Sequence, residues 1–261
     1  MSPRSSTPAS GSSEALDLPP GFTGITLREY HDAVKEACAR AAEHGAGTLF
    51  WVRRFDTIEF AVVLEPEETL VTARRALFAV MNAAVDALAA HVPPERPIAL
   101  EWPDTIVLDG GVIGGARLAA PPGCSEDEVP EWLVAGIVLR NVVPVRTVVA
   151  SGGHQLDTPH IHGTSLEAEG IEIIDGAAII ASFARHLMVY FDLWQEKGFQ
   201  PVAEQFLAHI PEAKGFKRGI DFNGDLLMKY YRSPDKVERR DLKDELAAPQ
   251  WMDPKTGEPW L

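Results

Sequence analysis

Four side chains with metal-ligating chemistry fall within one short polar stretch of the chain. His154, Asp157, His160 and His162 follow the spacing H-x2-D-x2-H-x-H. Neutral imidazole and carboxylate are good ligands for a borderline divalent ion, and a loop can bring such ligands together. The alternative is a solvated loop with chance histidines, because no second cluster fixes a coordination geometry. The spacing leaves both interpretations open.

Three tryptophans form a second group with possible binding chemistry. Trp51, Trp102 and Trp132 fall on or beside expected strands. Together they could form the floor of an apolar pocket for an acyl chain or a ring. Each alone is better suited to a hydrophobic core, which needs no further function.

Three arginines are the cations expected nearest to these tryptophans. Arg53, Arg54 and Arg117 stand out in a chain with more acids than bases. Arginines beside a cavity are candidates for binding a carboxylate or a phosphate, because the planar guanidinium matches both groups. The alternative is that they are strand-end residues that pair with Asp56 or Glu59 at the surface.

Helices and strands that position these groups can be predicted from the hydrophobic pattern. Apolar residues at three- and four-residue steps predict helices over 26–44, 69–91, 175–197 and 201–209. Apolar β-like runs predict strands over 48–53, 58–64, 98–102, 105–108, 112–118 and 132–139. Asp109-Gly110 is typical of a two-residue hairpin turn. The order of elements predicts an α+β fold, in which a mostly antiparallel mixed sheet carries helices on one face.

Composition divides the chain into three parts. Residues 1–21 are rich in Ser, Pro, Gly and Thr and are expected to form a disordered tail. Residues 22–212 carry the predicted helices and most strands, so we expect one large domain there. Residues 213–261 contain short β runs and are expected to form a small β-rich domain.

The charge and the apolar content exclude several classes of protein. The chain has 38 acidic and 24 basic residues and a net charge of −14, which disfavours nucleic-acid binding. We find no apolar run of the length that a membrane span needs. Two cysteines cannot form a disulfide framework, so we expect a cytoplasmic protein. Acidic neighbours would raise the pKa of Cys124, which argues against a nucleophilic thiolate there.

Several motifs occur in the order found in one known family. The chain has Glu-Trp-Pro-Asp-Thr at 101–105, Gly-Gly at 114–115 and Val-Ala-Gly-Ile-Val-Leu-Arg-Asn-Val at 134–142, followed by Thr-Ser-Leu at 164–166 and Glu-Gly at 169–170. This order resembles the biotin/lipoate A/B protein ligases. Each motif alone is weak, but their common order is more specific.

The resemblance implies a ligase-like fold and a place for the site. The acyl pocket of that family lies between the Trp-Pro-Asp hairpin and the Gly-Ile strand. The residues that this implies for ligand binding are Trp51, Arg53, Arg54, Trp102, Asp104, Gly114, Gly115, Gly136 and Asn141. They combine aromatic rings, glycines, cations and hydrogen-bonding groups, as expected of an apolar pocket with a few polar groups. The resemblance assigns no metal to the stretch around His154, Asp157, His160 and His162.

The resemblance also implies a chemistry. These ligases activate a carboxylate with ATP and pass the acyl group to a lysine of a carrier domain, so biotin, lipoate and octanoate are the implied ligands. Three departures stand out: Val112 occupies the position of the family's active-site lysine, Glu101 replaces another lysine, and the Gly-Arg-rich loop is reduced to a short turn. Ordinary ligation is therefore expected to be slow, since these groups would neutralise developing phosphate charge.

Three functions follow from these observations. The first is a divergent acyl ligase or acyltransferase that binds a small carboxylic acid or an acyl-adenylate-type ligand. The second is a noncatalytic relative that binds such a ligand or regulates a partner. The third is a metal-dependent enzyme that uses the loop around His154, His160 and His162. The fold alone does not decide among them.

Overall fold

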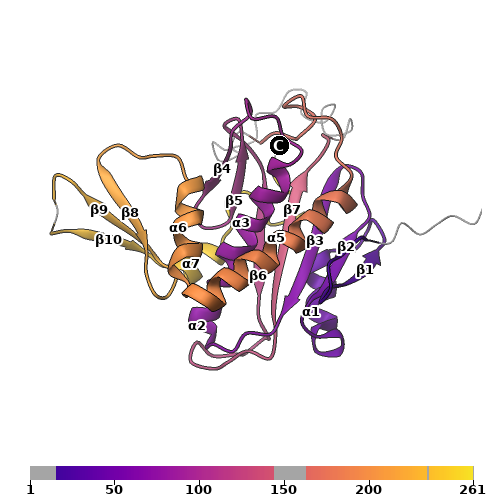
Figure 1. Cartoon of the computed structure of the whole chain (residues 1–261), viewed down its shortest axis with the longest axis horizontal. Coiled ribbons are helices and arrows are strands. Elements are labelled where there is room, and N and C mark those ends of the chain that lie inside the picture. Colours follow the sequence, from indigo (N-terminus) through magenta and orange to yellow (C-terminus); the bar gives the residue numbers. More distant parts are fainter. Residues whose placement is uncertain (1–15, 144–162, 234, 261) are drawn as a thin grey trace, which may run out of the picture.

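A seven-stranded mixed sheet forms the centre of the computed structural model, which describes residues 16–143, 163–233 and 235–260 (Figure 1). The strand order is β1-β2-β3-β7-β6-β5-β4, and within this sheet β1 and β2 run parallel while all other neighbours run antiparallel. The strands are β1 (Thr23–Leu27), β2 (Thr48–Val52), β3 (Thr57–Leu64), β4 (Ile98–Glu101), β5 (Thr105–Leu108), β6 (Gly111–Ala119) and β7 (Leu133–Arg140). The predicted α+β class with a mostly antiparallel mixed sheet is confirmed.

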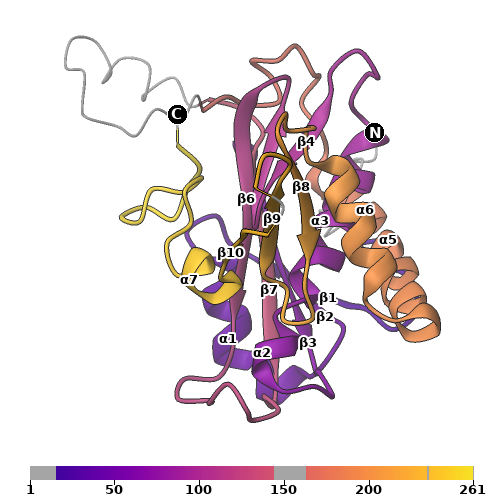
Figure 2. The ribbon, with the colours of Figure 1, turned by 90° about the vertical axis from the view of Figure 1, so that its left-hand side faces the viewer.

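Helices cover the sheet unequally on its two faces. They are α1 (Ala33–His44), α2 (Leu70–Ala73), α3 (Ala76–Ala89), α5 (Gly176–Lys197) and α6 (Gln200–His209). Leu49 and Trp51 of β2 belong to the core built with α3, α5 and α6, whereas Phe50 and Val52 pack with α1 on the opposite face. Figure 2 shows α5 and α6 on one side of the sheet and α1 on the other. All five residues of β2 are buried, so this strand needs a cover on both faces, and the helices are not confined to the one face that the order of elements predicts.

Two helices have limits that differ from the sequence prediction. The helix predicted from residue 26 begins only at Ala33, because the residues before it form β1 beside β2. Asp32 fixes this start, since its side chain accepts a hydrogen bond of 2.8 Å from the backbone N–H of Lys35. The helix predicted over 69–91 is divided into α2 and α3 by a turn at Arg74.

The β5–β6 hairpin has the turn that its sequence predicts. Asp109 (φ 49°) and Gly110 (φ 88°) both have left-handed backbone conformations, as a two-residue turn of this kind requires. The preceding β4–β5 hairpin contains a cis peptide bond between Trp102 and Pro103. These two hairpins form the edge of the sheet at which the predicted Trp-Pro-Asp motif lies.

The last part of the chain forms a second, smaller sheet and then returns to the first. Its elements are β8 (Phe216–Ile220), β9 (Leu226–Tyr230), β10 (Val237–Arg240) and α7 (Leu242–Leu246). Residues 251–260, which we call the C-terminal loop, fold back on themselves through a β-bridge between Met252 and Pro259. They reach the main sheet on the side of α1, as the yellow segment of Figure 2 shows.

Helix α5 is the one described helix that is long and apolar enough to cross a membrane by length and composition. Arg185 and His186 interrupt its apolar run, so the sequence alone predicts no membrane span there. One face of α5 packs against α3 and α6, and Phe183 contacts Phe60 of β3 with ring centroids 4.7 Å apart. These contacts are typical of a core helix in a globular domain.

Candidate functional site

The C-terminal loop covers a polar patch on the α1 side of the main sheet. At its centre, Arg54 forms two hydrogen bonds with Asp56 (3.0 and 2.9 Å) and a third with Glu258 of the loop (2.7 Å). Burial works against ionisation of Asp56, but the hydrogen bonds and charge of Arg54 outweigh it and hold the pKa of Asp56 below its ordinary value. Arg54 thus pairs with Asp56, which is one of the alternatives that the sequence leaves open. It also binds the carboxylate of Glu258, from the C-terminal loop.

A second arginine lies on the other side of the same carboxylate. Arg140, at the end of β7, is 2% exposed, and its Nη2 lies 3.9 Å from Glu258 Oε2. Its Nη2 also donates a hydrogen bond of 2.5 Å to the carbonyl of Pro259. Burial lowers the pKa of Arg140, and the charges of Glu258 and Asp56 oppose that effect. The Glu258 carboxylate therefore lies between two guanidinium groups.

An apolar surface adjoins this charged group. Val107, Val112 and Val138 form a buried cluster with the Trp251 ring, which is 0% exposed. The ring lies directly on Gly115, where an added β-carbon would be 2.5 Å from the indole nitrogen. Only a residue without a side chain leaves room for the ring, so Gly115 provides close approach to the sheet.

Asp104 lies at the edge of this apolar surface and is almost fully buried. Its Oδ1 accepts a hydrogen bond of 3.2 Å from Thr105, while Oδ2 has no hydrogen-bond partner among the described residues. The indole N–H of Trp251 faces the carboxyl group without completing a hydrogen bond. Burial raises the pKa of Asp104 to about 7, against the smaller opposing effects of Thr105 and Trp251.

Trp102 lies on the outer side of Asp104, toward the small sheet. The guanidinium of Arg240 stacks over its ring at 5.3 Å, and its indole N–H is buried without a partner among the described residues. Trp102 and Asp104 both line a cavity of about 520 Å³ between the β4–β5 edge and the small sheet. Arg218 contributes a second cation to this cavity.

A buried carboxylate completes the polar patch. Glu59 lies in β3 on the α1 side, and its Oε1 accepts a hydrogen bond of 2.6 Å from the backbone N–H of Ala33. Burial raises its pKa, although this hydrogen bond and the charges of Arg54 and Arg117 oppose the rise. Arg117 itself pairs with Asp32 at 2.7 Å. These two contacts fix the start of α1 beside the polar patch. We call Arg54 and Arg140, the two residues around the Glu258 carboxylate, the arginine pair.

Several other predicted site residues contact neighbouring parts of the chain. Trp51 faces the α5 side of the sheet, and a β-carbon at Gly136 would clash with Val34 of α1. Gly114 (φ 155°) lies against the carbonyl of Val138. Arg53 is exposed, and its backbone N–H bonds to the carbonyl of Leu27.

Asn141 connects two loops. Its side-chain N–H groups donate to the carbonyls of Phe55 (3.2 Å) and Ile174 (3.1 Å), and its Oδ1 accepts from the N–H of Ile174 (3.3 Å). Every polar atom of this side chain therefore has a partner within the chain.

The predicted metal ligands His154, Asp157, His160 and His162 lie outside the described residues. Across residues 16–143, 163–233 and 235–260, no three His, Cys, Asp or Glu side chains are grouped to hold a metal ion. Desolvation and the Glu128 carboxylate raise the pKa of the Cys124 thiol, the direction that its acidic neighbours predict.

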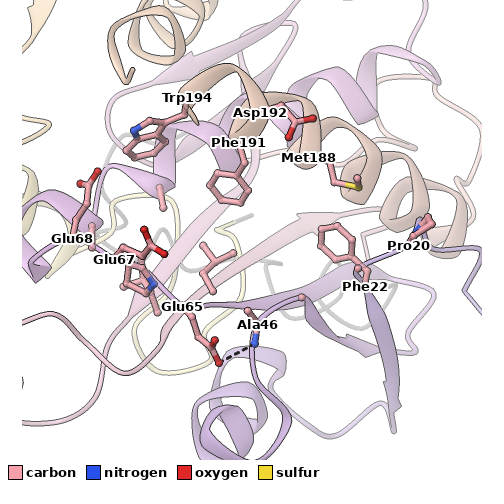
Figure 3. A pocket seen from close by; sticks show the side chains of 17 residues that line it. Pro20, Phe22, Ala46, Glu65, Glu67, Glu68, Met188, Phe191, Asp192 and Trp194 are labelled. Atoms are coloured by element: carbon pink, nitrogen blue, oxygen red, sulfur yellow. Dashed lines mark hydrogen bonds between the residues drawn. The ribbon is translucent and has the colours of Figure 1, made fainter. Parts of the chain in front are cut away.

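Another cavity, of about 580 Å³, lies away from these residues. Figure 3 shows Phe22, Phe191 and Trp194 around it, and Leu133, at the opposite end of β7 from Arg140, also lines it. Its carboxylates are Glu65, Glu67, Glu68 and Asp192. Glu65 already accepts a hydrogen bond from the N–H of Ala46. No Lys, Arg or His among the described residues lines this cavity, so they offer no cation there to bind an acid.

Four residues of the polar and apolar patch are not predicted as site residues from the sequence: Glu59, Arg140, Trp251 and Glu258. Two had a usable signal, because Glu59 and Arg140 are charged residues within otherwise apolar strands. Trp251 and Glu258 had none, since nothing in the local pattern shows that the C-terminal loop returns to the main sheet.

The chain is similar to known proteins over most of its length. The model of the biotin/lipoate A/B protein ligase family matches residues 18–208. A biotin–[acetyl-CoA-carboxylase] ligase of Paracoccus denitrificans is 25% identical in an alignment that covers 84% of this chain and 90% of that protein.

Solved structures share the same fold. A biotin protein ligase-like protein of unknown function from Silicibacter sp. TM1040 has a TM-score of 0.72 and 24% identity, over 88% of this chain and 98% of that chain. The biotin protein ligase of Aquifex aeolicus has a TM-score of 0.60 and 13% identity, over 84% of this chain and 95% of that chain.

Proposed function

Because the chain belongs to the biotin/lipoate A/B protein ligase family, we propose that it binds a small carboxylic acid at the patch beneath the C-terminal loop and transfers the acyl group to a carrier protein. One observation carries the binding step: Arg54 and Arg140 hold a carboxylate beside a buried apolar surface. Guanidinium groups suit a carboxylate or a phosphate equally well, so the same pair suits an acyl-adenylate.

The surroundings suit the ligand classes that the family implies. Val107, Val112 and Val138 offer an apolar surface to a ring or an acyl chain, and the arginines bind its acidic end. Lipoate and octanoate combine an apolar body with a terminal carboxylate, and biotin adds a polar ureido ring to an apolar chain that ends in a carboxylate. The proposed site takes residues from both expected domains, 22–212 and 213–261.

The transfer step is proposed from the family relationship. The Paracoccus relative is named as a ligase that acts on acetyl-CoA carboxylase, and an Aquifex structure was solved with biotin and ATP. In this chain Val112 is buried and apolar where the family has a lysine, so activation has one cation fewer than in the family. A noncatalytic ligand-binding relative is the second candidate, and this substitution is the observation that favours it.

Calorimetric titration of the full chain tests the binding step. Biotin, lipoate and octanoate are each compared with the corresponding amide, which keeps the apolar body but lacks the charge. We expect the acid to bind more tightly and Arg54→Gln to remove this preference, a loss of about 10- to 100-fold for one charge-assisted hydrogen bond.

Arg185→Gln, on the exposed side of α5, is the matched control and should keep the preference. Equal binding of acid and amide by the wild-type chain would contradict the proposal. Intact-mass measurement of a biotinyl or lipoyl carrier domain, after incubation with ATP and the acid, tests transfer separately.

A further inference from the structure

We propose that the C-terminal loop occupies the candidate site as an internal competitor, and that an acid with an apolar body and a terminal carboxylate displaces it. This inference rests on the proposed function, since it names how the same site is opened. The loop carries both chemical parts of such a ligand: an apolar ring in Trp251 and a carboxylate in Glu258.

Few side chains hold the C-terminal loop against the main sheet. Trp251 and Pro259 are buried against the sheet, and Glu258 contacts the arginine pair, whereas residues 254–256 between them are exposed. Within the loop, the N–H of Trp260 bonds to the carbonyl of Trp251 (3.0 Å), and the N–H of Asp253 to that of Glu258 (2.9 Å). Release of the loop therefore breaks the ring contact of Trp251, the contacts of Glu258 with Arg54 and Arg140, and the hydrogen bond from Arg140 to the carbonyl of Pro259.

Buried polar atoms without partners gather beneath this loop. Six side-chain atoms of this kind occur among the described residues. Four belong to the patch and the loop: Thr57 Oγ1, Asp104 Oδ2, Arg140 Nε and Trp251 Nε1. Thr57 of β3 and Arg140 of β7 are directly opposite each other in the sheet register, so they lie side by side. Unpaired buried polar groups are destabilising, and the folded loop leaves these four atoms without a hydrogen-bond partner among the described residues.

These missing hydrogen bonds distinguish the C-terminal loop, as a replaceable occupant of the site, from an ordinary segment of the protein core. Core segments normally satisfy their buried polar groups, and a ligand gains affinity where it supplies missing partners. An acid that places its carboxylate between Arg54 and Arg140 replaces the charge of Glu258. The exclusion is mutual, because two carboxylates between the same two guanidinium groups repel each other.

Glu258→Gln in the full chain tests the competition. The amide keeps the shape of the side chain but removes its charge, so the loop competes less well for the arginine pair. We expect the affinity for octanoate to rise about tenfold, the change that corresponds to loss of one modest charge contact. Lys255→Gln is the control within the same loop, since Lys255 is exposed. Its affinity for octanoate should equal that of the wild-type chain.

Hydrogen exchange gives a second measurement that does not depend on activity. Saturating octanoate should speed exchange of the N–H groups of Asp253 and Trp260, whose hydrogen bonds form while the loop is folded on the sheet. A purely structural loop would instead lose stability in Glu258→Gln and keep the same affinity for octanoate. Trp251→Ala should also bind more tightly if it folds, but Glu258→Gln decides the question without it.

The outcomes separate the two proposals. If the wild-type chain and Glu258→Gln bind octanoate equally and exchange does not change, the competition is overturned and the binding function stands. If neither chain binds octanoate, lipoate or biotin although exchange shows the loop released in Glu258→Gln, the proposed function fails and the competition fails with it.

Discussion

Gly115 of β6 lies directly beneath the ring of Trp251, so that a β-carbon at Gly115 would be 2.5 Å from the indole nitrogen. The two residues are far apart in the sequence, and their contact fixes how closely the C-terminal loop approaches the sheet. In the competition that we propose, the space above Gly115 is the place where the folded loop would exclude a ligand.

Gly115→Ala should destabilise the chain and loosen the loop. The added methyl group would collide with the ring of Trp251 and with the backbone carbonyl of Asp104, and such overpacking typically costs about 1–3 kcal/mol. Urea unfolding measures the effect. Gly219→Ala in β8 is the control, because a β-carbon there meets nothing within 4 Å. The same loss of stability in both variants would contradict the assigned contact.

Asn141→Ala should lower stability and leave the affinity for carboxylic acids unchanged. Its side chain satisfies backbone groups of Phe55 and Ile174, and leaving such groups unpaired costs about 1–3 kcal/mol. Urea unfolding and titration with octanoate are the two measurements. Gln250→Ala, which removes one hydrogen bond from an exposed side chain, should change stability by less than about 0.5 kcal/mol. A selective loss of octanoate binding in Asn141→Ala would assign this residue to the ligand instead.

Much of the sheet could be predicted because its signals are local. The Asp109-Gly110 turn and the apolar runs of β3 and β7 are visible in short windows of sequence. The start of α1 could not be predicted in this way. The apolar pattern of β1 is short and ambiguous, and this segment forms a strand only because it pairs with β2. Tertiary pairing decided this boundary rather than local propensity.

The candidate site shows the same limit more strongly. Arg54 could be singled out because it is a cation in a strand-connecting turn, but its partner Glu258 is 204 residues away. Contacts of this kind depend on where the C-terminal loop lies, and no periodicity encodes that. Asn141 was assigned to the pocket by resemblance, whereas its hydrogen bonds to Phe55 and Ile174 depend on loop geometry.

Biotinyl-adenylate formation by the wild-type chain should be slow. Val112 lies buried beside Val107 and Val138, so this position has no ammonium group to stabilise charge that develops on a phosphate. Loss of one such donor typically lowers the rate by about 10²- to 10³-fold. A coupled assay of pyrophosphate release, with biotin and ATP, measures it.

Val112→Lys in the Glu258→Gln background should raise this rate, and Val112→Met, which has similar length and no charge, should not. Fast turnover by the wild-type chain would show that adenylate formation in this protein does not need a cation at position 112.

Asp104 should make the stability of the chain depend on pH in an unusual direction. Burial raises its pKa from 3.8 to about 7 in the folded state. Between about pH 4 and pH 7 the unfolded chain has therefore lost a proton that the folded chain retains. Because the unfolded state then binds fewer protons, the contribution of Asp104 to the free energy of unfolding falls as pH rises through this window and levels off above it.

Asp104→Asn removes this titration, so the free energy of unfolding of the variant minus that of the wild-type chain should be larger at pH 8 than at pH 5. We expect an increase on the order of 1–2 kcal/mol, measured by urea unfolding at both pH values. Other titrating groups cancel in the difference. Asp127→Asn is the control, since a hydrogen bond from Ser125 lowers the pKa of this exposed carboxyl, and its difference should be flat from pH 5 to pH 8. A flat difference for Asp104→Asn as well would mean that the Asp104 carboxyl is ionised in the folded chain, with Trp251 or water supplying the hydrogen bond that Oδ2 lacks.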